Sequence, residues 1–131
     1  MLLGMSGSIT YAWIAAGGAL GSMARFWMGG WIAAIAGDRF PWGTLAINAI
    51  GSAVIGLVAG LTLEPGRLGW HPDVRIFLMV GICGGFTTFS AFSLQTLELL
   101  QRGQVTFAFG YTAVSIGLCL LAVWAGMILA R

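Results

Sequence analysis

Lysine is absent from this sequence of 131 residues, which has one histidine and four acidic residues. Charged residues make up 8% of the chain, against about 25% in soluble domains. So few charges cannot cover a surface that faces water, which excludes a soluble monomer. Cysteine is also scarce. Cys83 and Cys119 both lie in apolar stretches, and they fit neither a disulfide framework nor a metal-ligand spacing.

Hydrophobic residues are abundant instead, at 59% of the chain, and the mean hydropathy is +0.95. A membrane-spanning helix needs about 20 apolar residues. Four stretches reach that length, and they cover about residues 9–36, 44–63, 74–100 and 105–130. The sequence therefore predicts one all-α membrane domain over residues 1–131, with four spans and both termini on one side. Most charges fall between the spans or at a span end, at Asp38, Arg39, Glu64, Arg67, Asp73, Arg75 and Arg102.

The arginines give almost no signal for orientation in the membrane. Lys and Arg are usually enriched in cytoplasmic loops. Here the side of the termini and the opposite side carry similar numbers, with Arg67, Arg75 and Arg131 on the first and Arg39 and Arg102 on the second. Either other features orient the chain, or it inserts in both directions and an antiparallel homodimer can form.

Small residues recur at four-residue intervals in the first two spans. One line runs through Gly17, Gly21, Arg25 and Gly29, and another through Thr44, Asn48, Ser52, Gly56 and Gly60. Such lines let helix backbones approach closely in lipid. The contacts could form within one subunit or between subunits, and spacing alone does not separate these alternatives.

The third span contains the run Gly-Gly-Phe-Thr-Thr-Phe-Ser-Ala-Phe at 84–92. Glycines loosen a helix, and the two β-branched threonines favour an interruption near 84–88. Carbonyls freed at membrane depth need another partner, and broken transporter helices use them to hold cations. Two hypotheses stay open: a Na⁺ ion held by carbonyls near Gly84 and Thr87, or a continuous helix with glycine packing.

Two further polar side chains lie inside the first and second spans, where polar groups usually face a cavity or one another. Arg25 either locks helices together by bonding loop carbonyls or attracts anions directly. Asn48 either clasps another helix or lines a pore, because Thr44 and Ser52 share its face at four-residue spacing.

The fourth span carries a weakly polar stripe at Tyr111, Ser115 and Cys119. Its hydroxyls either bond carbonyls of their own helix or line a path. Phe89 and Phe92 in the third span point to one face. Such rings usually pack, but their electropositive edges could also contact an anion.

Together these residues resemble the Fluc (CrcB) family of fluoride channels. The resemblance covers nearly the whole chain, from Gly18 to the fourth span. Its motifs, in their order and spacing, are Gly-Gly-Ala-Leu-Gly-Ser-Met-Ala-Arg at 17–25, Gly-Thr-Leu-Ala-Ile-Asn-Ala-Ile-Gly-Ser at 43–52 and Gly-Ile-Cys-Gly-Gly-Phe-Thr-Thr-Phe-Ser-Ala-Phe-Ser at 81–93.

The resemblance implies a passive channel that exports fluoride across the inner membrane of a bacterium. It implies an antiparallel, dual-topology homodimer with two pores and a central Na⁺ held by the carbonyls of Gly84 and Thr87. The pore residues that it implies are Thr44, Asn48, Phe89, Ser90, Phe92, Tyr111 and Ser115, and Arg25 matches the arginine of the family's first helix. No catalysis and no nucleic-acid partner are expected.

Two positions depart from the family pattern. Gln95 stands where some relatives carry an acidic residue, and Cys119 stands where a relative carries a hydroxyl. The main rival function, a small four-helix proton-coupled drug exporter, needs a carboxylate at membrane depth. The acidic residues lie instead in loops or near a span end, at Asp38, Glu64, Asp73 and Glu98.

Two other functions are weaker. An intramembrane hydrolase would need a base near a buried nucleophile, and the one histidine, His71, lies in a loop next to Pro72. A purely structural assembly protein is the remaining alternative.

Overall fold

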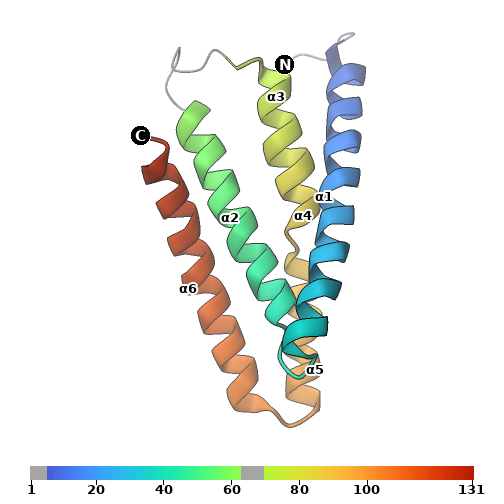
Figure 1. Cartoon of the computed structure of the whole chain (residues 1–131), viewed down its shortest axis with the longest axis vertical. Helices are drawn as coiled ribbons and strands as arrows, with labels where there is room; N and C mark the ends of the chain where they lie inside the picture. Colours follow the sequence, from blue (N-terminus) through green and yellow to red (C-terminus); the bar gives the residue numbers. More distant parts are fainter. Residues whose placement is uncertain (1–5, 63–69) are drawn as a thin grey trace.

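The computed structural model describes residues 6–62 and 70–131, and the regular structure in these ranges is entirely helical. The chain forms a bundle in which both termini lie at the same end (Figure 1). In chain order the elements are α1 (Ser6–Ala36), α2 (Trp42–Thr62), α3 (Pro72–Ile76), the π-helix η1 (Phe77–Cys83), α4 (Gly84–Phe86), α5 (Phe89–Gln101) and α6 (Val105–Leu129). Elements α3 to α5 follow one another as a single interrupted segment.

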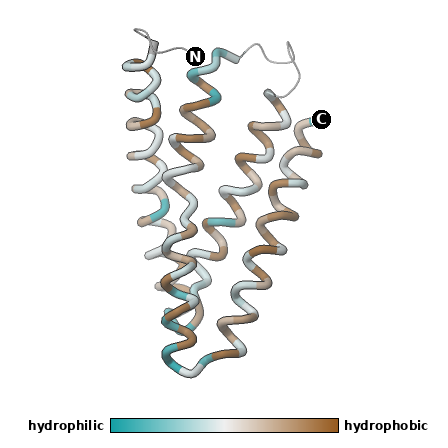
Figure 2. Tube along the Cα trace, turned by 180° about the vertical axis from the view of Figure 1, so that it is seen from behind, coloured by the Kyte–Doolittle hydropathy of each residue, from teal (hydrophilic) through white to brown (hydrophobic). Residues whose placement is uncertain are grey.

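The four predicted spans agree with these elements to within three residues at each described end. Leu63, the predicted end of the second span, and the loop charges Glu64 and Arg67 lie outside the described residues. Among the described residues, three helical segments, 42–62, 72–101 and 105–129, are long and apolar enough to cross a membrane. With 31 residues α1 has the length, but its glycine, serine and tryptophan residues make it less apolar. Figure 2 shows hydrophilic residues mainly near the helix ends.

Two turns at the end of the bundle opposite the termini depend on glycine. Gly37 follows α1 with φ 80°, and Gly103 follows α5 with φ 74°. These are left-handed conformations that glycine adopts without a steric cost, and they commonly end helices. The first turn reverses the chain into α2, and the second lets α6 run back beside α2.

Close backbone approach at glycines holds the bundle together in two pairs. α2 packs mainly on α6, and α1 packs mainly on η1 and α4. A Cβ added at Gly17 would lie 2.7 Å from the Phe77 carbonyl oxygen, and one added at Gly56 would overlap the carbonyl of Val123. The small-residue lines at Gly17 and Gly56 therefore serve contacts within the subunit, which spacing alone did not decide.

A buried cluster joins α2, α5 and α6 near the end of the bundle opposite the termini. It contains Leu45, Phe92, Leu99, Ala108 and Tyr111. Tyr111 is completely buried, and the half-buried Phe40 packs its ring edge against the Tyr111 ring, with centroids 5.4 Å apart. This cluster fixes Phe92 and Tyr111 beside the break in the third segment.

Candidate functional site

The third segment is broken at Thr87 and Thr88, within the predicted range 84–88. Both residues are extended, with φ −83° and ψ 156° at Thr87 and φ −152° and ψ 114° at Thr88. Helix α4 ends at Phe86 and α5 begins at Phe89. The predicted interruption is therefore confirmed, and the alternative of a continuous helix is wrong. The π-helix that precedes the break, η1, was not predicted.

Side chains replace the helical hydrogen bonds that the break removes. Asn48 bonds both main-chain groups of Thr88: its Oδ1 accepts the Thr88 N–H at 2.8 Å, and its Nδ2 donates to the Thr88 carbonyl at 3.0 Å. Thr88 Oγ1 accepts the Ala91 N–H at 3.1 Å and so caps α5. Arg25 Nε donates to the Gly85 carbonyl at 3.0 Å. Three elements therefore contribute to holding the break in place.

The carbonyls of Gly84 and Thr87 are among those at the break that lose the N–H that a continuous helix would supply four residues later. The partner of Gly84 would be the Thr88 N–H, which goes to Asn48 instead. The partner of Thr87 would be the Ala91 N–H, which goes to the Thr88 hydroxyl. Carbonyl oxygens of this kind are the hard ligands that suit a small cation. The donor set at the break therefore fits Na⁺.

No cluster of three or more His, Cys, Asp or Glu side chains occurs within residues 6–62 and 70–131. The side-chain chemistry there does not favour a transition-metal site. Any cation at the break would depend on main-chain oxygens.

A pocket of about 480 Å³, here called the central pocket, lies beside the break. Its walls come from α2, the end of η1, the break, α5 and α6, and no charged side chain is among them. It is lined by Asn48, Gly51, Ser52, Ile55, Cys83, Thr87, Thr88, Phe89, Phe92, Ser115, Ile116, Cys119 and Leu120. The structure thus brings four of the seven predicted pore residues into one space: Asn48, Phe89, Phe92 and Ser115.

Ser115 carries a buried hydroxyl without a hydrogen-bond partner in the described part of the chain. The residue is 7% exposed and lines the central pocket. Three residues earlier, Thr112 satisfies its hydroxyl by donating to the Ala108 carbonyl at 2.9 Å. The self-satisfied arrangement expected of helical hydroxyls therefore holds for Thr112 but not for Ser115. A buried polar group that is left unpaired is costly, and one in a pocket is commonly completed by a ligand or water.

The two phenylalanines of α5 differ in their surroundings. Phe92 is 9% exposed, and its ring centroid lies 5.1 Å from that of Tyr111 and 5.3 Å from that of Phe89. Phe89 is 78% exposed within the single chain. Phe92 is therefore locked by packing, whereas the Phe89 ring borders the open side of the central pocket.

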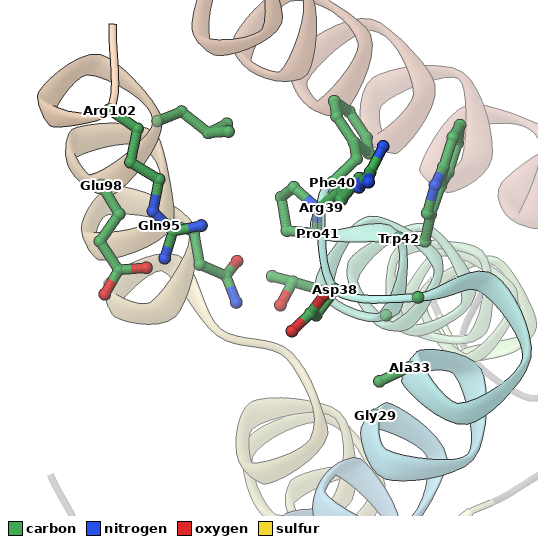
Figure 3. A pocket seen from close by; sticks show the side chains of 14 residues that line it. Gly29, Ala33, Asp38, Arg39, Phe40, Pro41, Trp42, Gln95, Glu98 and Arg102 are labelled. Carbon is green, nitrogen blue, oxygen red and sulfur yellow. The ribbon is translucent and has the colours of Figure 1, made fainter. Parts of the chain in front are cut away.

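A second pocket, here called the end pocket, lies at the end of the bundle opposite the termini (Figure 3). In Figure 3, Gln95 and Glu98 of α5, together with Arg102 just after its end, face the α1–α2 connection across this space, and that connection carries Asp38 and Arg39. Thr44 also lines it. The pocket therefore has a polar wall with charges of both signs.

A hydrogen bond connects the neighbourhoods of the two pockets. The Tyr111 hydroxyl donates to Gln95 Oε1 at 2.9 Å, and Gln95 lines the end pocket. The Tyr111 ring contacts Phe92, which lines the central pocket. Tyr111 is completely buried and lies between the two spaces.

Four predicted site residues line neither pocket: Arg25, Gly84, Ser90 and Tyr111. Of these, Gly84 and Ser90 belong to the broken segment. Ser90 is exposed on α5, and its Oγ lies 3.3 Å from Thr88 Oγ1. Gly84 is exposed in front of the break. Sequence reasoning did not assign a role to Thr88, which supplies the α5 cap and both bonds to Asn48. An N-cap threonine three residues before Ala91 was the available signal.

The fold and these pockets define a small helical membrane protein whose third segment is broken beside an uncharged polar pocket. A family model described as "CrcB-like protein, Camphor Resistance (CrcB)" matches residues 12–127. The chain therefore belongs to the CrcB-like family, and it is a multi-pass membrane protein. The family expected from the motifs is confirmed.

Three similar proteins carry the name fluoride-specific ion channel FluC. The protein from Rhodospirillum rubrum is 54% identical over 118 residues, which cover 90% of this chain and 92% of that protein. Those from Methylocella silvestris and Opitutus terrae are 51% and 52% identical over 120 residues, which cover 92% of this chain and 92% and 91% of theirs. The similarity extends over nearly the full length of each.

Proposed function

We propose that this chain forms a passive channel selective for fluoride, which exports the ion from the cytoplasm across a bacterial inner membrane. The observation that carries the proposal is the buried Ser115 hydroxyl, which has no hydrogen-bond partner among the described residues and lines a pocket with Asn48 and Phe92. The names of the similar proteins support the same ion. No reaction is catalysed, since conduction needs only binding and release.

The chemistry of fluoride explains why such a pocket would suit it. A small anion holds its water tightly, so a pore must replace that water with hydrogen-bond donors and positive dipole ends. Asn48 and Ser115 supply an amide N–H and a hydroxyl, and phenyl rings supply electropositive edges. The absence of charged side chains from the pocket lining keeps binding weak enough for the ion to leave.

The proposed path connects the two pockets. Fluoride would enter or leave through the end pocket, past Thr44, and pass the buried Tyr111 into the central pocket. The Tyr111–Gln95 bond orients the phenol at this passage. Gln95 accepts that bond through its amide oxygen, so an acidic residue is not required there. Ser90 would add a hydroxyl on the exposed face of α5.

A second copy of the chain would close the central pocket. Phe89 borders its open side and is largely exposed in one subunit. Gly110 and Gly117 lie on one face of α6, and a Cβ atom added at either position would have no neighbouring atom within 4 Å in the single subunit. Small residues of this kind support close helix contacts in lipid. Together with the balanced arginines, these features support an antiparallel homodimer with two pores.

A Na⁺ ion held by the carbonyls of Gly84 and Thr87 would belong to the same dimer. The diverted N–H groups of Thr88 and Ala91 support this assignment. When bound, the ion would supply positive charge that stabilises the carbonyl ends at the break. Arg25 would hold the neighbouring Gly85 carbonyl and so act structurally.

Ion efflux from liposomes tests the proposed function. Purified protein should release fluoride rapidly and chloride barely at all, as followed with ion-selective electrodes. Liposomes without protein are the control. Equal efflux of the two anions, or proton-coupled uptake of a cationic drug without fluoride efflux, would refute a fluoride channel and favour the rival exporter.

Labelling from both sides of the membrane tests the dual topology. A cysteine placed at the C-terminus by Arg131→Cys should react with an impermeant maleimide equally from either side in cells. Asp38→Cys, at the opposite end of the bundle, should give the same equal labelling. Reaction of each cysteine from one side alone would contradict the antiparallel dimer.

A further inference from the structure

Asn48 makes two hydrogen bonds to a single residue of the break, Thr88. One amide thus satisfies both the N–H and the carbonyl of an extended residue, as a neighbouring β-strand would. We infer that Asn48 is a positioning residue that keeps the break open and thereby couples the anion path to the cation-binding carbonyls. This inference rests on the proposed function, because it concerns the same pore and the same Na⁺ site.

The coupling follows from the partner of one N–H group. In a continuous helix the Thr88 N–H would donate to the Gly84 carbonyl. Here Asn48 Oδ1 accepts that N–H at 2.8 Å, so the Gly84 oxygen is released to face a cation. Without Asn48 the N–H would be left unpaired at membrane depth, which is costly. The segment would relax toward the helix and recapture the Gly84 oxygen.

The other side chains at the break do not perform this task. Arg25 Nε donates to the Gly85 carbonyl at 3.0 Å, and Thr88 Oγ1 caps α5 through the Ala91 N–H at 3.1 Å. Both contacts stabilise the neighbours of the critical N–H but leave that N–H to Asn48. Within residues 6–62 and 70–131, Asn48 is the side chain that bonds the Thr88 main chain.

The same amide also faces the anion path. Asn48 lines the central pocket, and its Nδ2 group carries two hydrogens. One hydrogen is used on the Thr88 carbonyl at 3.0 Å, which leaves the second to donate to fluoride. Cation binding and anion binding therefore depend on the same side chain through different atoms, Oδ1 for the first and Nδ2 for the second.

Two substitutions separate these atoms. Asn48→Ala removes the acceptor and the donor together. Asn48→Asp keeps an oxygen that can accept the Thr88 N–H, but it removes the amide donor and adds negative charge to the anion path. Thr62→Val is the matched control, since Thr62 lies on the same helix and its hydroxyl bonds only carbonyls of that helix.

The main readout is thermal unfolding of the detergent-solubilised protein without fluoride, in NaCl titrated against N-methylglucamine chloride at constant ionic strength. Wild type should gain stability as Na⁺ rises. Asn48→Ala should raise the half-maximal Na⁺ concentration about ten-fold, the factor that corresponds to losing one hydrogen bond of about 1.4 kcal/mol. Asn48→Asp should keep this concentration at or below the wild-type value while fluoride efflux falls more than ten-fold. Thr62→Val should change neither.

Two results would overturn the inference: an Asn48→Ala protein with the wild-type Na⁺ midpoint, or a wild type that Na⁺ does not stabilise. If Asn48→Ala yields no folded protein, hydrogen exchange decides. The Thr88 amide hydrogen should be protected from exchange in wild type and in Asn48→Asp. Rapid exchange of this hydrogen in both proteins would overturn the inference. A wild type that passes no fluoride but shows the expected Na⁺ midpoints would refute the proposed function and the link to the anion path. It would leave standing the part of the inference that concerns the Asn48 bonds and the Gly84 carbonyl.

Discussion

Ser115→Ala should separate conduction from stability. The Ser115 hydroxyl is buried and has no partner in the described chain, so its removal breaks no hydrogen bond of the fold. A buried polar group without a partner costs about 1–3 kcal/mol, so the variant should be as stable as wild type or more stable. A hydrogen bond to a charged partner contributes about 1.5–3 kcal/mol, which corresponds to a factor of about 10 to 150. Fluoride efflux from liposomes should fall by at least about ten-fold.

The matched control is Thr112→Val, one helical turn away on α6. Its hydroxyl is satisfied by the Ala108 carbonyl at 2.9 Å and is not available to an ion. Thr112→Val should conduct like wild type, and thermal unfolding in detergent should report the stability of both variants. The reasoning is refuted if Ser115→Ala conducts within two-fold of wild type, or if it loses stability that Thr112→Val retains.

Three further sets of substitutions test the phenylalanines, the glycine contacts and Arg25. Phe92→Ile and Phe89→Ile should each lower fluoride efflux. Only Phe92→Ile should also lower the free energy of unfolding, because the Phe92 side chain is 9% exposed and packed, whereas Phe89 is 78% exposed. Gly56→Ala should lower the free energy of unfolding by about 1–3 kcal/mol, because the added Cβ would overlap the backbone of α6. Gly30→Ala is the control and should leave stability unchanged, because a Cβ at that position would have no atom within 4 Å. Arg25→Gln should cost about 1.5–3 kcal/mol, the value of a hydrogen bond from a charged donor, and leave efflux per folded channel unchanged.

Each of these predictions has a contrary result. Wild-type efflux in both phenylalanine variants would mean that the rings only pack. Equal stability of the two glycine variants in a denaturant titration would contradict the close approach of α2 to α6. A fully stable Arg25→Gln protein with reduced efflux would show that the arginine attracts anions instead of holding a carbonyl.

Helix positions could be predicted because they depend on local properties of the chain. Apolar runs separated by charges gave the helix bounds to within three residues at the described ends, and the glycines and threonines of 84–92 located the break. Phe89 and Phe92 were recognised through a motif, since residue physics alone favoured packing for both. The structure retains packing for Phe92 and leaves Phe89 largely exposed.

The remaining features depend on contacts between distant residues. Asn48 and Thr88 are 40 positions apart, and no local pattern indicates that the amide bonds both main-chain groups of one threonine. The free Ser115 hydroxyl and the satisfied Thr112 hydroxyl look alike in sequence. The roles of the glycines diverge for the same reason. Gly56 contacts α6 closely, whereas Gly110 has open space around it.

The break between Phe86 and Phe89 has an electrostatic consequence as well as a geometric one. Each helix terminus carries a partial charge of about half an elementary unit, positive at the amino end and negative at the carboxyl end. An interrupted segment therefore has two additional termini inside the bundle, one that ends at Phe86 and one that begins at Phe89. Main-chain dipoles alone can attract a cation on one side of the gap and an anion on the other. The break thus places a main-chain dipole end of each sign inside the bundle of a chain in which only 8% of the residues are charged.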